Sequence, residues 1–291
     1  MNHKLTLFPL ALIAFAVITL LLFQSSLGLG DWPAFHNASQ ALLRGEHPYL
    51  AHVPDGGRTL CIYNPPWVLA LTAPFALLPI RLGWAMLNAT CLLLVLLTAR
   101  RLGASWLVLL LSIPILYRAT WTGNVDGFTF FGAALPAPAG LFLAILKPQN
   151  TLGLILFWAF WAWRQGGLPR LIRTFLPVGI ALAVSLALFG PWYRVVCPFT
   201  TSAHFALFPA GVPFGLLMLG LAIATKRKYL ALAASPLLSP YFSYSAIILL
   251  PVWGLMFLQD FAAWLYRAGA QALVMVRQRP ARRAFAPPDA R

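Results

Sequence analysis

The sequence predicts an all-α protein, a polytopic bundle of transmembrane helices with about ten crossings. Hydrophobic residues make up 60% of the 291 residues, charged residues make up 9%, and the mean hydropathy is +0.79. Apolar stretches near the length that crosses a hydrocarbon core of roughly 30 Å recur along the chain. This combination is typical of a multi-pass membrane protein.

The basic residues indicate the orientation in the membrane. The net charge of +15 comes mainly from clusters at 100–101, 164–173, 226–228 and 267–291. With Lys4, these clusters lie in the cytoplasm if the positive-inside rule holds, which puts both termini there. A membrane chain with this charge distribution needs no nucleic-acid partner. We expect a transmembrane domain over 1–266 and a disordered basic tail over 267–291, close to the anionic lipid of the bilayer.

The first crossing is predicted over Leu5–Leu27, as an uncleaved helix without a small-x-small cleavage site. The next apolar stretch, 66–80, is too short at about 1.5 Å per residue to cross the core, and Pro74 and Pro79 interrupt it. We interpret it as a re-entrant or interfacial segment. The first outer loop then covers 28–81, and the second crossing covers 82–99.

The remaining crossings follow from apolar length and charge. Between Asn124, expected outside, and Arg164, expected inside, the number of passes must be odd, and pieces bounded by Pro136 and Pro148 suggest three short ones. The other crossings are predicted at 104–117, 174–190, 210–224, 229–239 and 244–265.

A short amphipathic helix is predicted in the first outer loop, with Asp31 as its N-cap and Gly45 at its end. Its apolar face comprises Trp32, Phe35, Leu42 and Leu43, and its polar face comprises His36, Asn37, Gln40 and Arg44. The polar groups suit the hydroxyls of a sugar. An ordinary interfacial helix with one wet face fits the pattern equally well.

Asp31 stands where the first apolar run ends, and it is one of 6 acidic residues. A carboxylate at the bilayer centre costs roughly 2.5–3.5 kcal/mol on insertion scales, so an acid at the edge of the membrane is a functional-site hypothesis. Two outer cations are further candidates. Lys147 lies between two apolar runs and fits either a phosphate ligand or a snorkelling lysine. Arg118 fits a phosphate ligand or a structural pair with Asp126.

Several short motifs occur together between residues 28 and 150. They are Gly30-Asp31, Ala41 to Tyr49 (ALLRGEHPY), Tyr63-Asn64-Pro65-Pro66, Ala73 to Pro79 (APFALLP), Gly123-Asn124-Val125-Asp126, Ala139-Gly140-Leu141 and Lys147-Pro148-Gln149. This combination resembles glycosyltransferase family 87, which belongs to the GT-C superfamily of polyprenyl-phosphate-sugar-dependent membrane enzymes. Where that family often has Ser-Pro-His, this chain has Ser239-Pro240-Tyr241.

The resemblance implies a GT-C-like bundle that acts as an inverting transferase on the outer face of the cell membrane. It would move a hexose, most plausibly mannose, from a polyprenyl phosphate to a hydroxyl of a glycan or glycolipid acceptor. The polyprenyl phosphate leaves as a stable anion, so cations are needed in place of a general acid, and one carboxylate suffices as general base. We expect no cofactor and no metal, because Asp31 and Asp126 are a small ligand set for a divalent cation.

The predicted site residues have three roles. Asp31 is the catalytic base; Arg118, Lys147 and Tyr241 bind the donor phosphate; His36, Gln40, Tyr49, Tyr63, Asn124 and Asp126 bind substrate. Two other functions remain open. One is a non-catalytic membrane protein that keeps the GT-C-like scaffold. The other, which is less favoured, is a transporter of a lipid-linked solute, since the predicted crossings contain almost none of the ionisable residues that transport pathways use.

Overall fold

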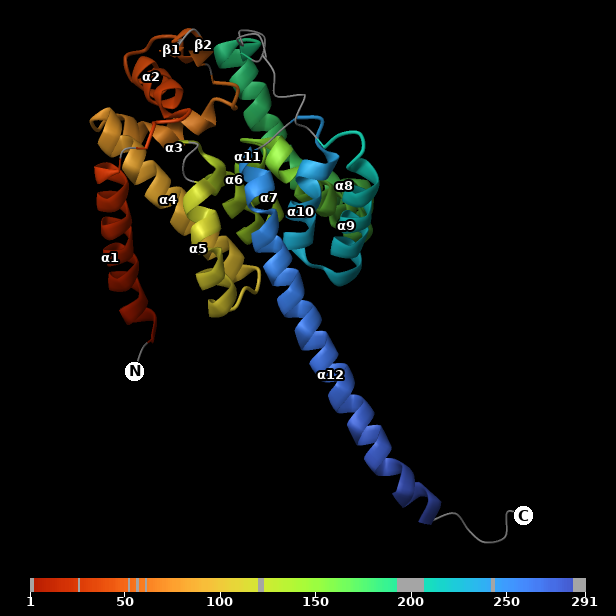
Figure 1. The fold of residues 1–291 in the computed structure, drawn as a ribbon. Helices are drawn as coiled ribbons and strands as arrows, with labels where there is room; N and C mark the ends of the chain where they lie inside the picture. Colours follow the sequence, from red (N-terminus) through yellow and green to blue (C-terminus); the bar gives the residue numbers. More distant parts are fainter. Residues whose placement is uncertain are drawn as a thin grey trace.

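A computed structural model describes residues 3–25, 27–51, 53–55, 58–60, 62–119, 123–192, 207–241 and 244–284 (Figure 1). Nearly all of this part of the chain is helical. The helices are α1 (His3–Gln24), α2 (Trp32–Leu43), α3 (Trp67–Ala76), α4 (Ile80–Arg101), α5 (Trp106–Ala119), α6 (Asp126–Phe131), α7 (Ala137–Ala144), α8 (Pro148–Phe189), α9 (Val212–Thr225), α10 (Lys228–Leu238), α11 (Tyr244–Ile248) and α12 (Leu250–Ala284). Short 3₁₀ turns form η1 (Pro48–Leu50) and η3 (Gly132–Ala134), and β1 (Val53–Asp55) pairs antiparallel with β2 (Arg58–Leu60).

Three helical segments of the described chain are long and apolar enough to cross a membrane: α4, α8 and the stretch Tyr244–Gln271. The predicted class, an all-α protein with membrane-spanning helices, is therefore supported. Helices lie at each range where a crossing was predicted, but several are short. At about 1.5 Å per residue, α6 and α7 reach only part of the way through a hydrocarbon core of roughly 30 Å.

The short helices α6 and α7 form a hairpin. Gly132 and Gly140 face each other so closely that a Cβ on either would lie within 2.6 Å of the other's carbonyl oxygen. At the tip of the hairpin, the Lys228 ammonium donates to the carbonyls of Ala133, at 2.9 Å, and Leu135, at 3.3 Å. The hairpin thus runs from Asp126 towards the end of the molecule that carries the 226–228 cluster, and returns to Lys147.

The region 28–81, predicted to be the first outer loop, folds as predicted in outline. Helix α3 is ten residues long, contains Pro74 and ends before Pro79, so it is too short to cross. Helix α2 packs on α3, where the Ser39 and Thr72 hydroxyls form a hydrogen bond of 2.8 Å. Figure 1 shows both helices and the β1–β2 hairpin at one end of the molecule.

The amphipathic helix 32–43 is confirmed, but its buried face differs from the predicted one. Trp32 is fully buried and Phe35 is buried, whereas Leu43 is 52% exposed. Trp32 donates its indole N–H to the carbonyl of Ile80 at 2.8 Å. Small residues complete the face that packs on α3, because Ala and Ser let the two helices approach closely. The prediction counted only large apolar side chains, so it overlooked these small residues. The predicted stop at Gly45 is confirmed by its φ of 76°.

The basic cluster 164–173 lies at a break in α8, where Gly166 and Gly167 have non-helical backbone angles and Gly167 has a φ of 58°. One expectation about the rest of the chain needs correction. The tail was predicted to be disordered from residue 267, but it is helical as far as Ala284. It forms the C-terminal part of α12, which extends away from the other helices (Figure 1). Ala, Arg, Gln, Leu and Met dominate this stretch, and all are strong helix formers. Residues 285–291 lie outside the described part.

The helices pack around two hydrophobic clusters. One is built on α1 to α4 and includes Trp32, Trp84 and Val125. The other is built on α5 to α12 and includes Phe130, Trp158 and Trp253. Because Val125 and Phe130 belong to different clusters, the segment around α6 lies where the two clusters meet.

Glycine makes this junction possible. A Cβ on Gly127 of α6 would lie 2.3 Å from the Cα of Cys91 on α4, a distance that neither backbone can accept without moving. We expect Gly127→Ala to destabilise the protein by about 1–3 kcal/mol through overpacking, seen as a lower melting temperature in detergent. The control is Gly179→Ala on α8, where nothing lies within 4 Å of the new methyl. Equal stability of Gly127→Ala and wild type would contradict the close packing of α4 and α6.

Candidate functional site

Asp31 occupies the position before the first residue of α2, but its carboxylate does not cap the helix. The structure shows no side-chain capping bond. The predicted N-cap bond is therefore wrong, and the local sequence explains why. Pro33 has no N–H to offer, and the N–H of Ala34 already donates to the backbone carbonyl of Asp31 at 3.1 Å. The carboxylate is left available for a tertiary contact.

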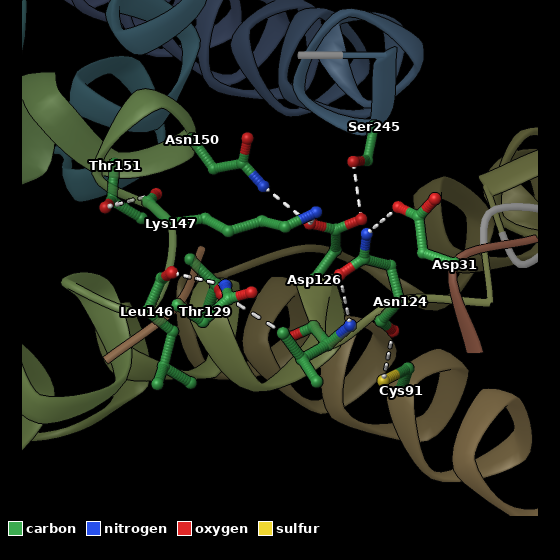
Figure 2. Close-up of polar contacts among 12 residues, drawn as sticks. Asp31, Cys91, Asn124, Asp126, Thr129, Leu146, Lys147, Asn150, Thr151 and Ser245 are labelled. Carbon is green, nitrogen blue, oxygen red and sulfur yellow. Dashed lines mark hydrogen bonds and ion pairs between the residues drawn. The ribbon is translucent and has the colours of Figure 1, made fainter. Parts of the chain in front are cut away.

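That contact is with Asn124. Its side-chain amide donates to Asp31 Oδ2 at 2.5 Å (Figure 2). The Asn124 side-chain oxygen accepts the N–H of Val125 at 2.8 Å, which fixes the orientation of the amide. Gly123, with a φ of 57°, turns the chain here so closely against Leu29 that a Cβ would lie 2.0 Å from the Leu29 carbonyl oxygen. The Gly123-Asn124 pair thus joins the entrance of α2 to the start of α6.

Asp126 is the centre of a second set of contacts, two residues further on. Its Oδ1 accepts the side-chain amide of Asn150 at 2.8 Å and lies 3.0 Å from the Lys147 ammonium. Its Oδ2 accepts the Ser245 hydroxyl at 2.6 Å. Figure 2 shows Lys147 and Asn150 reaching Asp126 from one side and Ser245 from α11. The ion pair is largely buried, with 16% of the Lys147 side chain and 10% of the Asp126 side chain exposed.

This geometry argues against one of the two alternatives for Lys147, the snorkelling lysine. A snorkelling lysine would extend its ammonium towards water, but here the ammonium turns into the protein and pairs with Asp126. The loop before it is also fixed, because the Asn64 amide donates to the Leu146 carbonyl at 2.6 Å and the Tyr49 hydroxyl donates to the Asn64 carbonyl at 2.7 Å. Motifs far apart in the sequence therefore act together to position Lys147.

A cavity of about 470 Å³ lies beside Lys147. Its walls combine aromatic rings, Pro residues and a few polar groups, and they include Tyr63, Asn64, Lys147, Gln149, Trp192, Ser239 and Tyr241. The volume is within the range of about 300–1,000 Å³ that small-molecule sites occupy. The Ser239-Pro240-Tyr241 motif and the Lys147-Pro148-Gln149 motif therefore share one cavity.

The charges of Lys147 and Asp126 also act on Asp31. Protein surrounding the carboxylate raises the pKa of Asp31 above its ordinary value of 3.8, although the residue keeps contact with solvent. The positive charge of Lys147 opposes this rise, the negative charge of Asp126 adds to it, and the hydrogen bond from Asn124 opposes it. Burial, followed by the charge of Asp31, raises the pKa of Tyr63, which lines the cavity.

The other predicted site residues lie in different surroundings. Gln40 donates its amide to the carbonyl of Ala76 at 2.5 Å and so ties α2 to α3. His36 packs edge-on against Trp32, with ring centroids 5.6 Å apart. Tyr49 supports Asn64 and stacks on Trp192, with centroids 5.6 Å apart. Arg118, at the end of α5, is exposed and is not among the residues that line the cavity. Asp126, its suggested structural partner, forms its ion pair with Lys147.

Sequence reasoning missed Asn150, Ser245, Gln149 and Trp192. Asn150 is fully buried and Ser245 is 3% exposed, and both bind Asp126. A signal for Asn150 was present, since it lies three residues after Lys147 and therefore on the same face of a helix. Ser245 carries no such signal, because a single serine beside an apolar run is common and its partner lies more than a hundred residues away.

The arrangement combines two functional groups that group-transfer chemistry uses. A carboxylate with a raised pKa can accept a proton from a hydroxyl, and an ammonium beside a partly aromatic cavity can bind an anion. Comparison of the chain with protein-family models, with curated proteins and with solved structures finds no match. The function therefore has to be argued from the site itself.

Proposed function

We propose that this protein is a membrane glycosyltransferase that moves a hexose, most plausibly mannose, from a polyprenyl phosphate to an acceptor hydroxyl with inversion at the anomeric carbon. The observation that carries the proposal is that two sets of contacts meet at the start of α6: Asn124 holds Asp31, and Asp126, two residues further on, holds Lys147 in the wall of the 470 Å³ cavity. The negative charge of Asp31 suits removal of the proton from the acceptor hydroxyl, and the positive charge of Lys147 suits the phosphate that leaves.

In the proposed reaction, the acceptor hydroxyl oxygen attacks the anomeric carbon of the donor sugar. Its proton passes to the Asp31 carboxylate, and the bond from the anomeric carbon to the phosphate oxygen breaks. The phosphate leaves with the electron pair as an anion, which needs a cation beside it and no general acid. Lys147 is the cation in the cavity wall, and Tyr241 and Gln149 supply hydrogen-bonding groups there. Asn124 holds the Asp31 carboxylate in orientation.

A second function has one observation in its favour. Lys147, Asn150 and Ser245 satisfy both oxygens of Asp126 without any ligand, as expected if the contacts serve only to hold α6, α8 and α11 together. The protein would then be a non-catalytic member of the same architecture. The transferase proposal is favoured because a purely structural role does not explain the cavity beside Lys147.

The direct test uses the purified full chain in detergent, labelled polyprenyl phosphate mannose and a cell-envelope extract as the source of acceptors. We expect label to move into a product that survives mild acid, under conditions that hydrolyse the unreacted donor. The Asp31→Asn variant at the same concentration is the control. Absence of labelled product from the wild type, with the protein folded and the donor intact, would favour the structural role.

The proposed location of the site, on the outer face of a cell membrane with both termini in the cytoplasm, predicts a labelling pattern. Single cysteines are introduced into a background in which Cys61, Cys91 and Cys197 are replaced by Ser. We expect Arg118→Cys to react with an impermeant maleimide in intact cells. Arg101→Cys and Lys228→Cys should react only after the membrane is opened. Labelling of position 101 in intact cells would reverse the assignment of faces.

A further inference from the structure

A second, larger cavity lies away from the proposed active site. Its volume is about 720 Å³, and it is lined by residues from the start of α7, the turn inside α8 and the connection between α9 and α10. All these segments lie at the end of the molecule with the basic clusters, where the α6–α7 hairpin has its tip. The residues used below are Trp158, Trp161, Arg170, Arg173, Lys226 and Lys228, all of which line it.

Four cations line this cavity, and none of them forms a salt bridge within the described part of the chain. They are Arg170, Arg173, Lys226 and Lys228. The neighbouring Arg227 is different, since it pairs with Asp260 at 3.0 Å. The chain has only 6 acidic residues to set against 21 basic ones, so it has few carboxylates with which to balance these charges. The Lys228 ammonium already donates to the carbonyls of Ala133 and Leu135, so the charges of Arg170, Arg173 and Lys226 are those that favour an anion from outside the chain.

The aromatic wall adds to this preference. The Lys226 ammonium lies 5.3 Å from the centroid of the Trp161 ring, and the Lys228 ammonium lies 5.8 Å from that of Trp158. The two rings thus hold the Lys226 and Lys228 ammonium groups at the cavity wall.

We propose that this cavity binds a phosphate group, and that its natural source is the headgroup of an anionic lipid. Arginine forks match phosphate oxygens in pairs, and a basic pocket between helices on the cytoplasmic side is suited to such headgroups. Tryptophan at the edge of the bilayer suits the boundary between acyl chain and headgroup. The site is separate from the donor site at Lys147, and the proposal does not depend on transferase activity.

The experiment measures binding of phosphatidylglycerol to the full chain in neutral detergent by native mass spectrometry, with phosphatidylcholine of the same acyl chains for comparison. Inorganic phosphate is titrated separately, with the melting temperature as readout. We expect the double variant Arg170→Gln/Arg173→Gln to lose about tenfold or more in affinity for phosphatidylglycerol, since each charge-assisted bond is worth more than a neutral one.

The matched control is Arg164→Gln, in the same basic segment but outside the cavity lining. It should change the affinity less than about twofold, because surface charges away from the site contribute little. Preference for phosphatidylglycerol over phosphatidylcholine that depends on Arg170 and Arg173 supports the lipid headgroup. Stabilisation by inorganic phosphate with the same dependence supports the phosphate site and identifies a soluble anion as its ligand. Equal losses in Arg164→Gln and the double variant, or no binding of either probe, would overturn the proposal.

Discussion

Replacing Asp31 with Asn is expected to lower the turnover of sugar transfer by roughly 10²–10⁴-fold, the range typical of a lost acid–base group. The change keeps the size of the side chain. The new amide oxygen can still accept the bond that Asn124 donates to Asp31 in the wild type. What is lost is the ability to take a proton. The measurement is the rate of labelled mannose transfer at saturating donor.

The same variant should be no less stable than the wild type at neutral pH. The surrounding protein is the main cause that raises the pKa of Asp31 above 3.8, so the folded protein disfavours the charged form relative to the unfolded chain, by an amount that the solvent contact of this exposed residue reduces. For an acid with a raised folded pKa, this destabilising contribution is present above the folded pKa and disappears as the pH falls below the unfolded value. Asn carries no charge to bury, so its melting temperature at pH 7 should match or exceed that of the wild type.

The pH dependence of kcat/KM distinguishes a catalytic base from a residue that takes no part in the reaction. In the wild type, kcat/KM should fall on the acid side with a midpoint above 3.8, because only the ionised carboxylate can accept a proton. The residual activity of Asp31→Asn should lack that step. Glu46→Gln is the control, since Glu46 is an exposed acid paired with Arg44 at 2.8 Å. Near-normal turnover in Asp31→Asn would assign Asp31 a structural role and make Asp126 the candidate base.

The parts of the fold that the sequence predicted are those governed by length and charge. Pro74 and the shortness of 66–80 correctly predicted a short helix at α3, and Gly45 correctly predicted where α2 stops. Predictions that required knowledge of packing partners failed. The large apolar Leu43 was assigned to the buried face of α2, yet Ala38 and Ser39 lie there because α3 approaches closely. Hydropathy has no means of detecting a neighbouring helix.

For the candidate site, too, the residues were predictable from the sequence and their packing partners were not. Asp31, Asn124, Asp126 and Lys147 were each predicted from the rarity of charge in an apolar chain and from motifs. Their contacts were not predictable, because the sequence suggested a cap for Asp31, and snorkelling was an open alternative for Lys147. Capping by Asp31 and snorkelling by Lys147 were inferred from neighbouring residues in the sequence alone. In the structure, both side chains form tertiary contacts instead. Pro33 removes the capping donor, and the α6–α7 hairpin returns the chain so that Lys147 meets Asp126.

Replacing Lys147 with Met should have the largest effect on stability. The Lys147–Asp126 pair is largely buried, and removing one partner leaves the other charge uncompensated, which typically costs about 3–5 kcal/mol. Donor binding should also weaken, since the cation of the cavity wall is lost. We expect a clear fall in the melting temperature in detergent, whereas Arg44→Met, which breaks the exposed pair with Glu46, should leave it nearly unchanged.

A double variant distinguishes the charge from the packing. In Lys147→Met/Asp126→Asn, neither group is charged, and the Asn side chain keeps an oxygen that can accept from Asn150 or Ser245. If the cost of Lys147→Met comes from the stranded Asp126 carboxylate, the double variant should be more stable than Lys147→Met alone, with a coupling of about 0.5–3 kcal/mol. It should nevertheless bind the donor as weakly as Lys147→Met, because the phosphate still lacks its cation. Recovery of donor binding together with stability would show that Lys147 acts only as a structural partner of Asp126, and that the donor phosphate, if the protein binds one, is held by other residues.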